Sequence, residues 1–166
     1  MSIISILKFN VISQPDPTDP NRIIQSPQLG HHALFSGGIV MDIVIGIDAI
    51  TAQSSQDESP IPSPIAAKAL VDTGCTITSI DNALATTLNL KIRGYNTIHT
   101  ANGIATANQH QVSLAFPGTN LKGRQTHTVQ TANLTGQPFQ VLIGRDLMAS
   151  WLITYNGPAG FVSIAD

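Results

Sequence analysis

Short segments rich in β-branched residues, separated by glycine and proline, constrain the fold of this chain most strongly. The 166 residues include 21 Ile, 16 Thr and 8 Val, together with 13 Gly and 10 Pro. β-Branched side chains favour strands, while Gly and Pro favour the turns between them. The apolar fraction of 42% is sufficient for a hydrophobic core. The pattern therefore predicts an all-β or mostly β fold, and the length fits one ordinary domain.

The order of the apolar segments predicts a series of hairpins. We expect strands at residues 39–47, 66–71, 91–100, 104–116, 123–134, 140–143, 151–155 and 161–165. The dipeptide Asn102-Gly103 is typical of a hairpin tip, because both residues tolerate positive φ. Asp81 is expected to cap a short helix over 82–88. A further helix of one or two turns should follow Gly144 and end by Ser150.

Two polar stretches interrupt this pattern. Residues 13–36 contain several prolines and predict an arm or a long loop. Residues 51–64 are rich in Ser and Pro and predict a mobile insertion between two strands that form a hairpin. We therefore divide the chain into an N-terminal extension, 1–36, and one domain, 37–166, with an inserted loop at 51–64.

Charge and composition exclude several classes of partner. The net charge is −2 and only 11% of residues are charged, so no basic excess exists to neutralise nucleic-acid phosphates. No apolar run approaches the ~20 residues of a membrane span, and the N-terminus does not resemble a secretory signal. A cytoplasmic protein without membrane contact is the expectation, and the single Cys75 is compatible with a reducing compartment. The five His residues lack ligand-like spacing, so we expect no metal and no cofactor.

The tripeptide Asp72-Thr73-Gly74 carries the strongest chemical signal. It follows the apolar strand at 66–71, so it places a carboxylate at the end of a sheet beside a Gly that permits a sharp turn. Peptide hydrolysis by carboxylates needs two of them close together and sharing one proton. On its own, the tripeptide is more often an Asp that caps a turn after a strand. Its sequence context favours the catalytic interpretation.

Residues 69–80, the hairpin at 97–107 and residues 141–147 together resemble the retropepsin-like aspartic peptidases. The resemblance covers about residues 37–166. It implies a closed acid-protease-like barrel of one lobe, with one short C-terminal helix and a β-hairpin flap. It also implies a peptide or protein substrate, bound in extended form.

The resemblance implies roles for three groups of residues. Asp72 would be the catalytic acid and base, with Thr73 and Gly74 shaping its loop. The flap that touches substrate would comprise His99, Thr100, Ala101, Asn102 and Gly103. Structural support behind the catalytic loop would come from Gly144, Arg145 and Asp146. Cys75, next in sequence, is interpreted as a small buried side chain, with oxidative regulation as the alternative.

The number of such motifs bears on the oligomeric state. No second Asp-Thr-Gly or Asp-Ser-Gly occurs in the sequence. An aspartic peptidase built from this chain would thus be a homodimer, with two copies of Asp72 meeting on a two-fold axis. Either chain end, 2–12 or 161–165, could form part of the dimer sheet.

Two other interpretations of the sequence remain open. The chain could be a catalytically inactive retropepsin-fold module that binds peptides or dimerises. It could also be an unrelated β-barrel binding domain in which Asp72 only caps a turn. For an active peptidase, composition predicts mainly apolar substrate pockets, and the shared proton of the dyad predicts activity at acidic to near-neutral pH.

Overall fold

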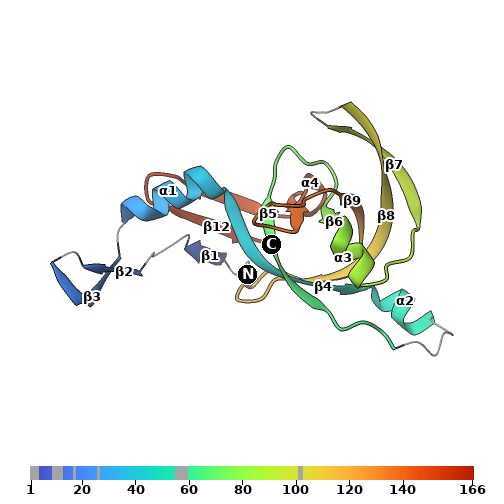
Figure 1. Ribbon diagram of the computed structural model, residues 1–166, viewed down its shortest axis with the longest axis horizontal. Coiled ribbons are helices and arrows are strands. Elements are labelled where there is room, and N and C mark those ends of the chain that lie inside the picture. The colour runs from blue at the N-terminus through green and yellow to red at the C-terminus, as the bar shows by residue number, and fades with distance from the viewer. Residues whose placement is uncertain (1–3, 9–12, 17, 26, 55–59, 101–102) are drawn as a thin grey trace.

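The computed structural model describes the chain except for residues 1–3, 9–12, 17, 26, 55–59 and 101–102 (Figure 1). The strands are β1 (Ile4–Lys8), β2 (Ser13–Asp16), β3 (Asp19–Gln25), β4 (Ile39–Ile47), β5 (Ile65–Val71), β6 (Ser79–Asp81), β7 (Gly94–Thr100), β8 (Gly103–Ala115), β9 (Arg124–Ala132), β10 (Val141–Ile143), β11 (Leu152–Asn156) and β12 (Phe161–Ala165). The helices are α1 (Pro27–Gly37), α2 (Ala49–Ser54), α3 (Asn82–Thr87) and α4 (Arg145–Met148). The fold is mostly β, as the sequence predicts.

The largest sheet has the strand order β4-β5-β10-β6-β9-β8-β7, and β4 also pairs with β8. This additional pairing closes a hydrogen-bonded ring from β4 through β5, β10, β6, β9 and β8. Side chains from several of these strands fill its interior, among them Ile43, Ile45, Ile80 and Val129, all fully buried. The strands expected between residues 39 and 143 are confirmed, with ends that differ by a few residues.

One pairing in this ring positions the Asp-Thr-Gly loop. Strands β5 and β10 run parallel, with Val141 opposite Ala69 and Ile143 opposite Val71. Parallel neighbours end at the same edge of a sheet. The residues that follow them, Asp72 and Gly144, therefore lie side by side although they are far apart in sequence.

A second, three-stranded sheet has the order β1-β12-β11. Figure 1 shows it beside the ring, with α1 along it and the β2–β3 hairpin beyond. The prediction of an arm or loop over 13–36 is therefore wrong in part, since β2, β3 and α1 occupy most of that stretch. The helix is held by tertiary packing: Leu34 is buried in the core, and His31 Nδ1 lies 2.9 Å from the carbonyl of Gly157.

Short helices connect several of the strands. Asp81 caps α3 by accepting a hydrogen bond from the backbone N–H of Ala83 at 2.8 Å, as predicted. Asn89 follows with φ of 48°, which ends the helix. The expected short C-terminal helix is α4, and the helix expected over 82–88 is α3, whereas α1 and α2 were not predicted. The predicted insertion begins inside α2, and residues 60–64 form no regular element. Within the described ranges, no helix is long and apolar enough to cross a membrane.

Candidate functional site

The loop that follows β5 folds back on its own aspartate. The backbone N–H of Gly74 donates to Asp72 Oδ1 at 2.8 Å, and the N–H of Cys75 donates to the Asp72 carbonyl at 3.1 Å. The N–H of Asp72 donates to the Ile143 carbonyl at 3.0 Å, which ties the loop to β10. A Cβ at position 74 would lie only 3.1 Å from Asp72 Oδ1, so glycine suits this turn. The half-buried Asp72 carboxylate is thus held at the edge of the sheet.

Arg145 braces the loop from behind. Its guanidinium donates to the Thr73 carbonyl at 2.7 Å and to Thr76 Oγ1 at 2.8 Å. Its backbone N–H donates to the Cys75 carbonyl at 2.9 Å. The loop is therefore held by side chain and backbone at once, and Arg145 lies where the sequence argument expects support.

Asp146 fastens the far end of the same loop. Its carboxylate accepts hydrogen bonds from the backbone N–H of Thr78 at 3.0 Å and from Thr78 Oγ1 at 2.8 Å. His127 Nε2 lies 3.0 Å from Asp146 Oδ2. Burial alone would raise the pKa of Asp146, but the hydrogen bonds from His127 and Thr78 outweigh it and lower the pKa.

Gly144 closes this network at its tightest point. Its backbone N–H donates to Thr78 Oγ1 at 3.1 Å. A Cβ on Gly144 would lie 2.7 Å from backbone atoms of Ile77 and Thr78, closer than real contacts allow. The role of His127 in this cluster was not predicted, because it comes from β9 and nothing near it in sequence indicates an acidic partner.

A cleft of about 660 Å³ opens in front of the Asp72 loop. Loop residues and residues of β6, β7, β9 and β10 line it: Asp72, Gly74, Cys75, Thr76, Ile77, Ser79, Asn96, Thr97, Ile98, Gln130, Ala132 and Leu142. The lining combines apolar side chains, such as Ile98 and Leu142, with polar ones, such as Asn96 and Gln130. Asp72 is the one acidic residue in this lining.

Polar side chains of the cleft form one connected row. Asn96 Nδ2 donates to Gln130 Oε1 at 3.0 Å, and Gln130 Nε2 donates to Ser79 Oγ at 3.1 Å. Ser79 Oγ in turn donates to the Ile77 carbonyl at 3.0 Å. Each step joins a different element, so the row runs across the wall of the cleft from β7 through β9 to β6.

Cys75 lies at the inner end of this row. Its Sγ donates to the Ile77 carbonyl at 2.9 Å and lies 3.5 Å from Ser79 Oγ. Burial raises the pKa of the thiol, so it stays protonated and poorly nucleophilic at neutral pH. These contacts favour a packing role for Cys75 over a reactive one.

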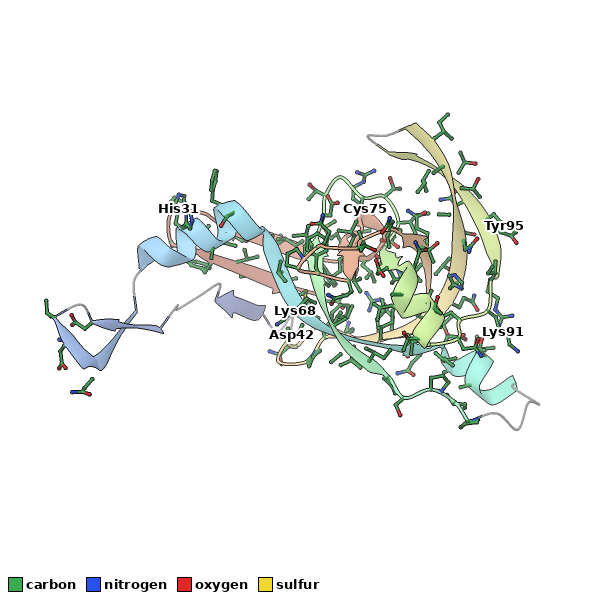
Figure 2. The ribbon with its side chains drawn as sticks, viewed as in Figure 1. His31, Asp42, Lys68, Cys75, Lys91 and Tyr95 are labelled. Carbon is green, nitrogen blue, oxygen red and sulfur yellow. The ribbon has the colours of Figure 1, made fainter. Side chains whose placement is uncertain are left out.

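The predicted flap corresponds to the hairpin of β7 and β8. The strands pair antiparallel from Gly94 opposite Gln109 to Thr100 opposite Gly103. His99 and Thr100 belong to β7, and Gly103 opens β8 with φ of 113°. Ala101 and Asn102 lie outside the described residues. Figure 1 shows the hairpin arching away from the ring, and Figure 2 shows Tyr95 on its outer side.

The chemistry available in the cleft is that of a single carboxylate. One ionised carboxylate can act as a base toward water, but general acid catalysis needs a second, protonated group. The cleft lining offers no other carboxyl group. Within the described part of the chain, no three His, Cys, Asp or Glu side chains are grouped so as to hold a metal ion.

Comparison with known proteins gives one family. The profile of the family described as "gag-polyprotein putative aspartyl protease" matches residues 64–150. No curated protein matches the chain. Among solved structures, a retropepsin-like aspartic protease from Rickettsia conorii is 16% identical, with 76% of this chain and 92% of that chain covered and a TM-score of 0.46. A Legionella pneumophila protein of unknown function is 17% identical, with 51% and 74% covered and a TM-score of 0.33.

Proposed function

This chain belongs to the gag-polyprotein aspartyl protease family, and from that premise we propose that it is an aspartic endopeptidase active as a homodimer. The observation that carries the proposal is the placement of Asp72. The matched region, 64–150, contains the Asp-Thr-Gly loop, its braces and the cleft that it faces. A cleft with one carboxylate is half of a catalytic dyad, and a second copy of the chain supplies the other half.

In the proposed mechanism, two Asp72 side chains share one proton across the two-fold axis. The ionised carboxylate takes a proton from a water molecule, which attacks the peptide carbonyl, while the protonated carboxyl donates to the carbonyl oxygen. The tetrahedral intermediate then collapses: the oxygen returns its proton to the second carboxylate, the C–N bond breaks, and the leaving nitrogen takes the proton that came from water, which restores the singly protonated pair. Two carboxyl groups that share one proton do not both ionise, because the two negative charges would repel each other. In the proposed dimer the pair therefore remains singly protonated at acidic to near-neutral pH. No metal or cofactor enters this scheme.

In this proposal, the other predicted site residues position the two Asp72 side chains or cover the substrate. Thr73 and Gly74 shape the loop, and Gly144, Arg145 and Asp146 fix it through the hydrogen bonds described above. We interpret the six-strand ring as a closed one-lobe barrel and the β7–β8 hairpin as its flap. Residues 99–103 would then cover an extended peptide and exclude water.

We further propose that the second copy docks along the three-stranded sheet. β12 is paired on both sides, with β1 and β11, so among the described residues the unpaired edges of this sheet belong to those two strands. An unpaired edge is a template for another strand. On β11, Leu152 is 71% exposed and Tyr155 is 53% exposed, an apolar edge that a partner would cover. Residues 161–165, one of the two chain ends predicted to join the dimer sheet, form the central strand β12, so they would not pair directly with a second copy.

The remaining assignments are proposals of the same kind. Residues 37–166 would form the catalytic domain with its insertion at 51–64, and residues 1–36 the extension. The partners would be a second copy and a peptide or protein substrate, with no nucleic acid and no membrane. A cytoplasmic location fits this set.

The proposal is tested by incubating an unbiased peptide library with the wild-type protein and with Asp72→Asn at several protein concentrations. The expected result is a set of cuts that disappears in the variant and that rises faster than linearly with protein concentration. Cuts that persist in Asp72→Asn would contradict the catalytic assignment. A folded dimer that makes no cuts would favour the inactive peptide-binding module.

A further inference from the structure

The wall of the cleft beside Asp72 carries an ordered row of neutral polar side chains. Asn96, Gln130 and Ser79 come from three strands, and Ser79 and Gln130 are direct partners across the β6–β9 pair. Gln130 and Ser79 are 8% and 2% exposed. Burying polar groups at this depth is costly unless they are hydrogen-bonded, so the row is a built feature of the cleft.

The hydrogen bonds of the row all run in one direction. Asn96 donates to Gln130, Gln130 donates to Ser79, and Ser79 donates to the Ile77 carbonyl. The side chains of Gln130 and Ser79 are thereby hydrogen-bonded within the row. An amide group has one acceptor oxygen and two N–H donors. Among the described residues, the Asn96 oxygen and its second N–H have no hydrogen-bond partner.

Asn96 therefore ends the row with one free acceptor and one free donor. It is half-buried and lines the cleft, so a bound ligand can reach it. An apolar ligand group placed there would remove water from both free groups and leave them unpaired, which is unfavourable. A carboxylate would meet no cation in the lining and would lie in the same cleft as Asp72.

We propose that this row is a specificity site that selects an uncharged, hydrogen-bonding side chain in the substrate, with the amides Asn and Gln taken best. A substrate amide offers one acceptor and donors, which match the free N–H and the free oxygen of Asn96. The inference rests on the proposed peptidase function and names the substrate class for it. The row fixes Asn96 through Gln130, so Gln130 is a positioning residue in this scheme.

The test compares matched peptides that differ at a single position. The starting sequence is one that the wild-type protein cuts or, if it cuts none, one that it binds in the peptide library. Each of its positions is varied in turn between Gln and Leu, and the position with the largest wild-type difference is kept for the variants. The variants are Asn96→Leu, Asn96→Asp and Gln130→Met. The matched control is Gln125→Met, an exposed position on the same strand as Gln130 that does not line the cleft.

The wild-type protein is expected to cut the Gln peptide about fivefold to tenfold more efficiently than the Leu peptide, as one hydrogen-bonded contact allows. Asn96→Leu should remove or reverse this preference. Asn96→Asp keeps the shape of the side chain but adds a negative charge. This variant should therefore prefer peptides with Lys or Arg at the varied position. Gln130→Met should weaken the preference, and Gln125→Met should leave it unchanged.

Binding gives an independent measurement. The Asp72→Asn protein is titrated with the same Gln and Leu peptides, which it cannot cut under the proposed mechanism. Cleavage without a polar preference would overturn the specificity site and leave the peptidase function standing. No cleavage, together with tighter binding of the Gln peptide that Asn96→Leu abolishes, would support the site and overturn the peptidase function. Equal binding of both peptides without cleavage would overturn both.

Discussion

Asp146 connects the end of the Asp72 loop to strand β9. Its carboxylate is bound by Thr78 from the loop side and by His127 from β9. Thr78 is fully buried, so loss of the carboxylate would leave its N–H without a partner and without water. A single side chain thereby contributes to both the stability and the geometry of the site.

Replacing Asp146 by Ala is expected to lower the free energy of unfolding by about 2–3 kcal/mol, the cost of leaving such a buried donor unsatisfied. Chemical denaturation measures it. The matched control is Asp42→Ala, which removes an ion pair to Lys68 in which both side chains are more than half exposed. That pair should be worth less than about 1 kcal/mol. Equal losses in the two variants would contradict this account.

The same carboxylate predicts how stability depends on pH. The pKa of Asp146 is lower in the folded chain than its ordinary value of 3.8. The unfolded chain therefore takes up the proton first as the pH falls. The stabilisation is complete above that ordinary value and is lost as the pH falls through the lower, folded pKa. The difference in stability between wild type and Asp146→Asn should be constant above about pH 5 and should shrink between about pH 5 and about pH 3. A difference that grows over this interval would contradict the assignment.

Residue-level prediction from sequence succeeded where the partners are close along the chain. The cap of α3 by Asp81 uses the N–H two residues later, a contact that local rules describe. Asp81 also accepts from the N–H of Leu134, 53 residues away, and this contact could not be foreseen. The pairing of Asp146 with His127 is of the same kind. Both depend on which strands become neighbours in the sheet.

At the scale of elements, the junction of β10 and α4 packs closely against the Asp72 loop. Gly144 has φ of −87°, so its backbone conformation is open to any residue, and only the lack of space requires glycine. A Cβ would meet backbone atoms of Ile77 and Thr78, which, unlike a side chain, cannot move away by rotating about a side-chain bond.

Gly144→Ala should therefore push the loop away from α4, with a loss of about 1–3 kcal/mol in stability and a lower kcat. Gly37→Ala is the matched control, because a Cβ there meets nothing within 4 Å. Thermal unfolding and peptide cleavage measure the two effects. Equal stability and equal cleavage rates for Gly144→Ala and Gly37→Ala would contradict a role of this close packing in the site.

Element prediction failed mainly in the N-terminal region. Residues 13–36 have the prolines and polar residues of a loop, yet α1 begins at Pro27, and proline is favourable in the first turn of a helix. Among the α1 side chains that the structure describes, those of residues 31–37, Leu34 is the buried one and contacts the core. Such a helix depends on tertiary packing, which local sequence rules do not contain.

At the scale of the whole molecule, the proposed dimer forms along the edge of β11 that is unpaired among the described residues. Leu152→Lys adds a charge to that edge and should raise the dissociation constant of the dimer about tenfold or more. Sedimentation velocity over a range of concentrations measures it. Ile92→Lys is the matched control, since Ile92 is an exposed isoleucine between α3 and β7, away from the three-stranded sheet. An unchanged dissociation constant for Leu152→Lys would place the interface elsewhere.

The central claim is that two chains build one catalytic site, and mixing wild-type protein with Asp72→Asn at constant total concentration tests it most directly. If subunits exchange freely, an equal mixture contains about one quarter wild-type dimers and should retain about one quarter of the wild-type activity. The Asp72→Asn chains in mixed dimers supply no ionisable partner, so those dimers are inactive. A retained activity of about one half, in linear proportion to the wild-type fraction, would show that each chain works alone and would contradict the shared dyad.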